Sequence, residues 1–172
     1  MDVFDAIRAR RCVRKFRRDP IPENVLKKVL NAARLAPTVE NFQPWKLVLV
    51  SDEDIKRKLV SACNNQKCIA EAPLVIVACG LPDEAYPMLG GYMNSYPVDV
   101  AMAMNQLMLA ATAEGLGTCL ITSFKEEKVA EAIGIPSEAR IVVITPLGYP
   151  AEEGEKNESK NLDELISYNK YA

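Results

Sequence analysis

The most concentrated chemical feature of the sequence is a run of positive charge near its start. Residues 8–18 hold seven of the 21 basic residues and no acid, so the rest of the chain has 14 basic residues against 23 acidic ones. Within the run, Arg10, Arg11 and Arg14 follow a predicted short helix, and their guanidinium groups could bind a phosphate bidentately. A compact positive site on an acidic body favours a specific anionic ligand over a long polyanion. A solvated charged segment explains the run alone equally well.

Two further segments carry side chains suited to ligand recognition. Residues 37–45 read Pro-Thr-Val-Glu-Asn-Phe-Gln-Pro-Trp and lie between a predicted helix and a predicted strand. Their amide, hydroxyl and proline groups suit a planar heterocycle, although an ordinary turn is the alternative, and for Trp45 itself we favour a place in the core. The amide cluster of residues 64–66, Asn-Asn-Gln, is by itself typical of the end of a helix.

The side chains that most enzymes use for acid–base or metal chemistry are missing or unsuitably placed. The chain has no histidine, which removes the commonest general base and the usual zinc ligands. Its five cysteines form no Cys-x-x-Cys pair, and their odd number argues against a closed disulfide framework. Cys79 and Cys119 lie in apolar runs and are interpreted as core residues. Catalysis would therefore depend on a bound cofactor.

Residues 115–118, Gly-Leu-Gly-Thr, resemble part of a dinucleotide-binding fingerprint but do not match one. They follow a predicted helix, precede a predicted strand and lack the third glycine. A nicotinamide cofactor would therefore be a transient substrate, without a Rossmann site. The two glycines are expected to end the helix and to let the backbone approach something flat.

The elements that position these segments alternate irregularly. Helical spacing, caps and breakers predict five helices, at residues 2–9, 22–36, 52–63, 98–114 and, starting from a Ser123–Glu126 capping box, up to Gly134. Apolar runs predict four strands, at residues 45–50, 73–79, 118–122 and 141–147. Prolines, glycines and tyrosines predict a loop or lid over residues 80–97. The order lacks a βαβ rhythm and favours an α+β sandwich.

The sequence predicts that two segments need a partner surface and that none enters a membrane. The predicted helix 98–114 is apolar almost all round, so it should be buried on every side, within the domain or at a subunit interface. The polar tail from Ala151 regains apolar residues from Leu162 onward and is expected to dock on a second copy. No stretch reaches the ~20 apolar residues of a membrane helix, and no secretory signal is present, so a cytoplasmic location is predicted. With a net charge of -2, we expect neither a nucleic-acid nor a membrane partner.

Four segments in the same order and spacing resemble the FMN-dependent nitroreductase family. They are residues 10–16 (Arg-Arg-Cys-Val-Arg-Lys-Phe), residues 32–38 (Ala-Ala-Arg-Leu-Ala-Pro-Thr) with 41–45 (Asn-Phe-Gln-Pro-Trp), residues 115–118, and residues 146–150 (Pro-Leu-Gly-Tyr-Pro). Each motif is weak alone, but four in the right order make chance agreement improbable. The resemblance covers residues 4–150.

The resemblance implies a fold, an assembly and a reaction. The fold would be an α+β three-layer sandwich, with a central, mostly antiparallel sheet of four to five strands flanked by helices. Residues 1–172 would form one FMN-binding domain, with 151–172 as an extended C-terminal arm, in a domain-swapped homodimer that shares two FMN sites. NADH or NADPH would reduce the FMN and leave before a flat small-molecule acceptor, such as a nitroaromatic or a quinone, enters in a ping-pong hydride-transfer mechanism. No side chain would act as nucleophile or base.

The resemblance also implies which residues contact FMN. Arg10, Arg11, Cys12 and Arg14 of the basic run would bind the phosphate and the pyrimidine edge, and Lys160 would also meet the phosphate. The polar loop from the other subunit would contribute Pro37, Thr38, Val39, Asn41 and Gln43, and the amides Asn65 and Gln66 would lie near the ring or ribityl chain. After the third strand, Leu120, Ile121, Thr122 and Ser123 would line the ring beside N5.

Departures from the family pattern leave the acceptor open. Position 12 is usually serine in the family, the lid is reduced to residues 80–97, and Ser159 aligns almost as well as Lys160. Related flavin chemistry is one alternative, namely flavin reduction, reductive dehalogenation or oxidative flavin fragmentation. A non-catalytic flavin-binding redox module is another. A nucleic-acid binder using residues 8–18 is disfavoured because no extended basic face or aromatic platform accompanies the run.

Overall fold

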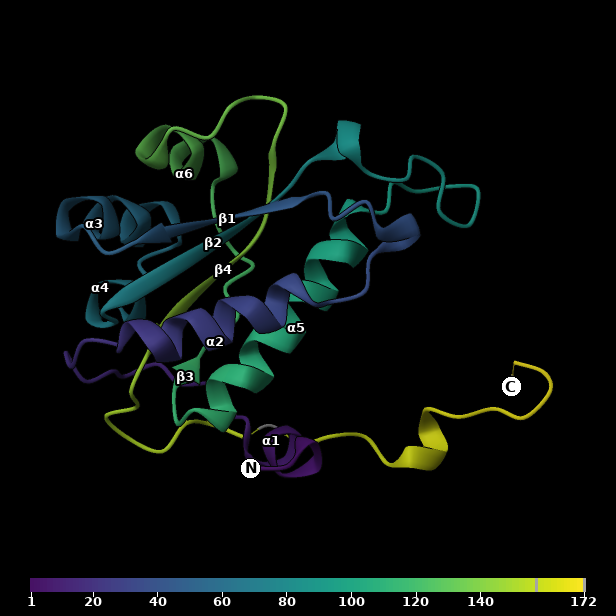
Figure 1. The fold of residues 1–172 in the computed structure, drawn as a ribbon, viewed down its shortest axis with the longest axis horizontal. Coiled ribbons are helices and arrows are strands. Elements are labelled where there is room, and N and C mark those ends of the chain that lie inside the picture. The colour runs from purple at the N-terminus through teal and green to yellow at the C-terminus, as the bar shows by residue number, and fades with distance from the viewer. Residues whose placement is uncertain (157, 172) are drawn as a thin grey trace.

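Helices and strands alternate irregularly along the chain in the computed structural model, which describes residues 1–156 and 158–171. In chain order the helices and strands are α1 (Val3–Ala9), α2 (Glu23–Arg34), β1 (Trp45–Val50), α3 (Glu53–Ala62), α4 (Cys68–Glu71), β2 (Leu74–Gly80), α5 (Tyr96–Ala113), β3 (Gly117–Thr118), α6 (Glu126–Ile133) and β4 (Arg140–Gly148). Short 3₁₀ helices lie at Val39–Asn41, Pro82–Glu84 and Leu162–Glu164. Their arrangement is drawn in Figure 1.

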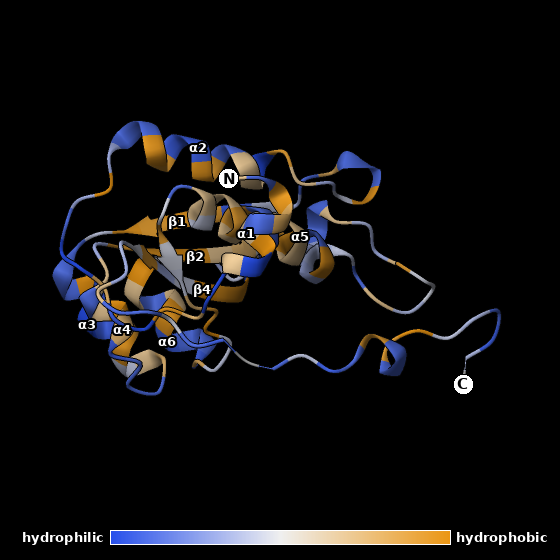
Figure 2. Cartoon of the chain, turned by 90° about the horizontal axis from the view of Figure 1, so that it is seen from below, coloured by the Kyte–Doolittle hydropathy of each residue, from blue (hydrophilic) through white to orange (hydrophobic). Residues whose placement is uncertain are grey.

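The four strands form one antiparallel sheet in the order β1-β2-β4-β3. All seven residues of β2 are buried, and they alternate between the two faces of the sheet. Ile76 and Ala78 pack with α2 and α5, whereas Val75 and Val77 pack with α3, α4 and α6. Figure 2 shows the sheet between α2 on one side and α3, α4 and α6 on the other. The predicted α+β three-layer sandwich is confirmed.

The start of α1 follows the predicted cap at Asp2, α3 begins in the same way, and the predicted start of α6 is wrong. The Asp2 carboxylate accepts the Asp5 N–H at 2.8 Å to begin α1, and Asp52 does the same for Ile55 at the start of α3. The Ser123–Glu126 capping box was wrong, because α6 has Lys125 as its N-cap. Ser123 Oγ instead accepts a hydrogen bond from Asn64 Nδ2 at 2.7 Å, which joins two loops.

The third strand is shorter than predicted. Only Gly117 and Thr118 pair with β4, and the chain meets β4 again at a single bridge between Ile121 and Ile144. Between these points the Cys119 N–H donates to the Thr145 hydroxyl at 3.3 Å, so the regular ladder is interrupted. The four-residue helix α4 had no sequence signal, because it is a single turn that buries Cys68 and Ile69.

Helix α5 is not buried on every side within one chain. Its buried side chains, including Val100, Met104 and Leu107, face the sheet and α2. Ala101 and Asn105 lie on the exposed side, and Met102 is 44% exposed there. An apolar surface therefore remains open on this helix. Within residues 1–156 and 158–171, none of the helices has the length and apolar character to cross a membrane.

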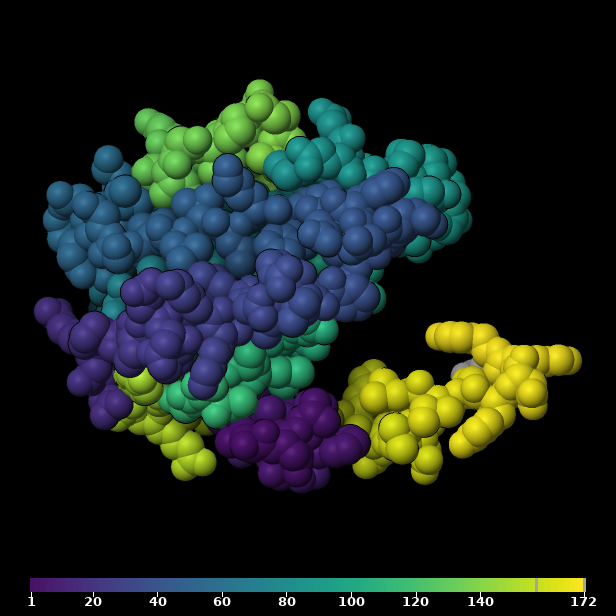
Figure 3. Space-filling model, in the orientation of Figure 1, coloured from purple at the N-terminus to yellow at the C-terminus, as the bar shows by residue number. Residues whose placement is uncertain are grey.

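The C-terminal segment leaves the body of the chain after Glu155. Figures 1 and 3 show it projecting away from the layers that contain the sheet. Its apolar side chains are between 43% and 85% exposed: Leu162, Leu165, Ile166 and Tyr168. These side chains lack the burial that their apolar character favours.

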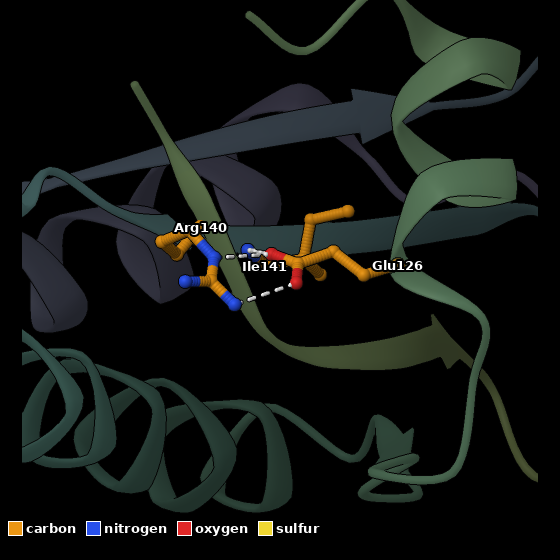
Figure 4. A network of polar contacts seen from close by, with 3 residues as sticks. All are labelled: Glu126, Arg140 and Ile141. Atoms are coloured by element: carbon orange, nitrogen blue, oxygen red, sulfur yellow. Dashed lines mark hydrogen bonds and ion pairs between the residues drawn. The ribbon is translucent and has the colours of Figure 1, made fainter. Parts of the chain in front are cut away.

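Glu126 joins α6 to β4 through three hydrogen bonds (Figure 4). Its carboxylate accepts from Arg140 Nε, from Arg140 Nη2 and from the Ile141 N–H, each at 2.9 Å. The bonds from Arg140 hold the pKa of Glu126 below its ordinary value.

We predict that Glu126→Ala lowers the free energy of unfolding by about 1–2 kcal/mol at neutral pH, because it removes charge-assisted hydrogen bonds. Since the folded-state pKa is depressed, this stabilisation is present above the ordinary glutamate pKa and is lost as the pH falls through the folded value. Urea unfolding of the wild type and the variant would measure the difference in their free energies of unfolding, which should be smaller at acidic than at neutral pH. Glu127→Ala, in the same helical turn, is the control and should change stability much less.

Candidate functional site

The basic run is held as an extended segment between the sheet and residues 149–155. Cys12 exchanges both backbone hydrogen bonds with Glu155 at 3.0 Å, and the Val13 N–H donates to the Thr118 carbonyl at 2.9 Å. Gly117 permits this approach, because a Cβ there would lie 2.6 Å from Val13 Cγ2. Gly117 was expected to let the backbone approach something flat. In this chain, the group that approaches it is Val13.

Carboxylates neutralise some of the basic side chains but not those predicted to bind phosphate. Arg8 pairs with Asp5, Lys15 with Glu152, and Arg17 with Asp19. In the part of the chain that the structure describes, Arg10, Arg11, Arg14 and Arg18 have no carboxylate partner. Three of these four cations are the predicted phosphate ligands. They retain their charge for an anion.

Arg14 brings three separate predicted segments together. Its Nη1 donates to Gln66 Oε1 at 3.1 Å, and it lies beside the thiols of Cys119 and Cys12. The neighbouring sulfur of Cys119, and then that of Cys12, raises the pKa of Arg14 above its ordinary value, so the guanidinium stays protonated. The structure therefore places a permanent cation next to an amide and a half-buried thiol.

The segment after β3 reaches the same neighbourhood. Leu120, Thr122 and Ser123 are exposed, and Ser123 contacts Asn64. Ile121 differs from the expectation for a ring-lining side chain. It is only 4% exposed, packs in the core, and exchanges backbone hydrogen bonds with Ile144. The predicted segment thus presents alternate side chains to the surface, with Ile121 turned inward.

Left-handed backbone conformations cluster in the two amide-rich loops. Five non-glycine residues there have φ between 50° and 60°: Glu40, Asn41, Gln43, Asn64 and Asn65. Among the described residues, only Asn169 is a further case. Residues other than glycine rarely adopt this left-handed backbone conformation except under structural constraint, and such residues cluster at ligand sites. Together with the guanidinium groups that have no carboxylate partner among the described residues, these loops provide donors and acceptors suited to a phosphate-bearing heterocycle.

One chain does not bring all the predicted residues together. The loop of residues 37–43 is tied to the first turn of α5, whereas the basic run lies beside β3, which follows the last turn of α5. The 18 residues of α5 span roughly 27 Å. Lys160 is exposed, in the C-terminal segment that projects from the body of the chain (Figure 1). Cys79 and Cys119 are buried, as interpreted from the sequence, whereas Trp45 is half-buried and packs against the core.

A buried acid, which the sequence reasoning missed, holds the loop in place. Asp99 is 0% exposed; its Oδ1 accepts the Val39 N–H at 2.9 Å, and its Oδ2 accepts the Ser95 hydroxyl at 2.7 Å. Ser95 Oγ also accepts the Tyr86 N–H at 3.0 Å. Asp99 therefore connects the polar loop with the segment expected to form a lid. The available signal was one acid inside an otherwise uncharged apolar run.

Known proteins show the same organisation. The sequence profile of the nitroreductase family matches residues 7–86 and 62–149. The crystal structure of a nitroreductase family protein from Clostridium difficile 630 superposes with a TM-score of 0.89 at 27% identity, covering 99% of this chain and 100% of that one. The predicted nitroreductase-like fold is confirmed.

Curated relatives carry different names. The chain is 32% identical to the NADH dehydrogenase of Thermus thermophilus, over 96% of this chain and 95% of that protein. It is 25% identical to the iodotyrosine deiodinase of Thermotoga neapolitana, over 98% of each.

We predict that Asp99→Ala lowers the free energy of unfolding by about 1–3 kcal/mol, because it leaves the N–H of half-buried Val39 and the hydroxyl of buried Ser95 without their acceptor. Hydrogen exchange should accelerate most at the Val39 amide. Asp99→Asn keeps the shape and one acceptor oxygen, so it should protect Val39 more than Asp99→Ala does. Equal exchange at Val39 in the wild type and Asp99→Ala would contradict the positioning role.

Proposed function

Because the chain belongs to the nitroreductase family of oxidoreductases, we propose that it binds FMN and uses NADH or NADPH to reduce a flat, electron-poor small molecule such as a nitroaromatic or a quinone. The observation that carries the proposal is the hydrogen bond from Arg14 to Gln66, in a basic run whose Arg10 and Arg11 have no carboxylate partner among the described residues. This cationic and amide cluster fits the phosphate and pyrimidine groups of FMN. Bound FMN supplies the hydride chemistry.

The chain's own residues bind and orient the cofactor in this proposal. Arg10, Arg11 and Cys12 hold the phosphate end, and Arg14 places a fixed positive charge at the pyrimidine edge, where it favours transfer of negative charge into the ring. The other contacts are Asn65 and Gln66, exposed Leu120, Thr122 and Ser123, backbone groups near Ile121, and Lys160. Since the chain has no histidine, we infer that water supplies the proton that the acceptor takes up.

We further propose that the complete site requires a two-fold homodimer. The loop residues Pro37, Thr38, Val39, Asn41 and Gln43 belong to a loop tied to the first turn of α5, whereas the basic run lies beside β3, after the last turn of this helix of roughly 27 Å. A second copy can place its loop against the basic run of the first, and symmetry then creates two equivalent sites. Residues 1–172 act as one domain, whose arm from residue 151 covers apolar surface of the partner, including the open side of α5.

A second activity for the same site is reductive dehalogenation. The support is the similarity, over 98% of each chain, to a protein named iodotyrosine deiodinase. The two activities differ in their products: an iodinated phenol would release iodide, whereas a nitroaromatic would give a hydroxylamine or amine. A third possibility, a flavin-binding redox module, would be reduced by NAD(P)H without turning over either class of acceptor.

We predict that the purified protein shows flavin absorbance near one FMN per chain, and that anaerobic NADH or NADPH bleaches it. Arg14→Gln should weaken FMN binding by about 10- to 100-fold, because a charge-assisted hydrogen bond is lost. Arg18→Gln removes another cation without a carboxylate partner, outside the proposed site, and should retain FMN. A colourless wild type that does not bind added FMN would refute the proposed function.

We predict that replacing Leu165 and Ile166 together with aspartate weakens the dimer and, at the same protein concentration, lowers FMN occupancy. The physical reason is that two apolar side chains would no longer be buried against the partner. Sedimentation velocity over a concentration series would measure the association. Asp163→Asn, in the adjacent turn, is the control. A wild-type protein that stays monomeric while binding FMN fully would contradict the shared site.

A further inference from the structure

Two thiols from distant parts of the chain meet beside Arg14. The Sγ atoms of Cys12 and Cys119 lie 2.7 Å apart, and the residues are separated by 107 positions. We propose that Cys12 and Cys119 are a redox modification site, which a low-molecular-weight disulfide converts reversibly into an intramolecular disulfide. The pair is formed by the chain's own side chains, so its oxidation does not depend on the proposed function.

The backbone around both cysteines is already held in register. Cys12 bridges Thr118, the residue before Cys119, and the Val13 N–H donates to the Thr118 carbonyl. On its other side, Cys12 exchanges two hydrogen bonds with Glu155. A disulfide forms without backbone movement only where the two side chains already face each other at short range. This arrangement meets that condition.

Exposure assigns different roles to the two sulfurs. Cys12 is half-buried, whereas the other four cysteines are buried and Cys119 is only 2% exposed. Burial and the hydrogen bond with Cys12 raise the pKa of the Cys119 thiol. Cys12 is therefore the sulfur that an external disulfide can reach, and Cys119 is the resolving sulfur.

Thiol–disulfide exchange with oxidised glutathione forms the disulfide in two steps. The Cys12 thiolate attacks one sulfur of oxidised glutathione, which releases one glutathione thiolate and leaves a mixed disulfide on Cys12. The Cys119 sulfur loses its proton to solvent and attacks the Cys12 sulfur of that mixed disulfide, which releases the second glutathione. The protein loses two thiol hydrogens, and one glutathione disulfide is reduced to two thiols.

The other thiols do not offer an equivalent pair. Burial raises the pKa values of Cys63 and Cys79 to about 11 and also raises that of Cys68. Cys68 is close enough to Arg14 to influence its pKa, so it is the most stringent control thiol. Cys79 lies in β2 and faces the core.

A consequence for the cofactor rests on the proposed function. Oxidation removes the S–H donor of Cys12 and ties the basic run to the residue before Leu120. Loss of one neutral hydrogen bond would weaken FMN binding roughly 3- to 10-fold. In the other direction, bound FMN should slow the reaction of Cys12 by covering it.

The test uses the full chain, with its FMN content measured first, equilibrated with mixtures of oxidised and reduced glutathione and then acid-quenched. Free thiols are alkylated, and peptide mass spectrometry maps the linkages. We expect one intramolecular disulfide joining Cys12 to Cys119, reversed by dithiothreitol. Cys12→Ser and Cys119→Ala should abolish it, whereas Cys68→Ala and Cys79→Ala should retain it.

Three results would overturn the proposal: five free thiols under oxidising conditions, a mixed disulfide on Cys12 that persists unresolved, or a linkage that pairs Cys12 with Cys68. Because the wild-type linkage map is decisive, the result does not depend on the folding of any variant. FMN titration of the oxidised and reduced wild type is a separate measurement. A mapped Cys12–Cys119 disulfide in a protein that binds no FMN would support the thiol site and refute only the proposed function.

Discussion

The proposed site depends on how the chain holds seven positive charges together between residues 8 and 18. Like charges at this density repel, so the segment needs attachments that do not consume its guanidinium groups. Backbone hydrogen bonds to Thr118 and Glu155 provide them from both sides. Carboxylates pair with some of the cations, but none of them pairs with Arg10, Arg11 or Arg14 among the described residues. The segment is thus rigid in its backbone while part of its charge stays available to an anion.

The division of the proposed site between the two ends of α5 follows from the same architecture. The basic run can approach the sheet only at its β3 edge, where Gly117 leaves room for Val13. The polar loop is fixed at the opposite end, because Trp45 begins β1 and Asp99 lies in the first turn of α5. No side-chain rearrangement can close a separation of roughly 27 Å. A ligand that needs both ends therefore requires two chains, and the exposed apolar side of α5 provides surface for such an association.

Sequence reasoning succeeded where local chemistry decides the structure and failed where distant contacts do. The limits of β1 and the cap at Asp2 were predictable, because apolar runs and side-chain-to-backbone hydrogen bonds are local. The Ser123 capping box was wrong because Asn64, 59 residues away, takes that hydroxyl. The role of Arg10, Arg11 and Arg14 as anion ligands stays a prediction from the sequence. The Arg14–Gln66 contact and the meeting of Cys12 with Cys119 depend on tertiary structure, which no short pattern encodes.

The retention of a fully buried Asp99 is better explained by specificity than by stability. Burying a carboxylate is unfavourable unless hydrogen bonds satisfy it, and an apolar side chain would fill the same space in α5 at lower cost. Asp99 accepts from one backbone amide in the polar loop and from Ser95, which in turn accepts from Tyr86. A network in which each donor has one acceptor permits a single arrangement of loop, helix and lid segment. The left-handed residues Glu40 and Asn41 follow directly after Val39, so this network holds the strained part of the loop in the conformation that a ligand would meet.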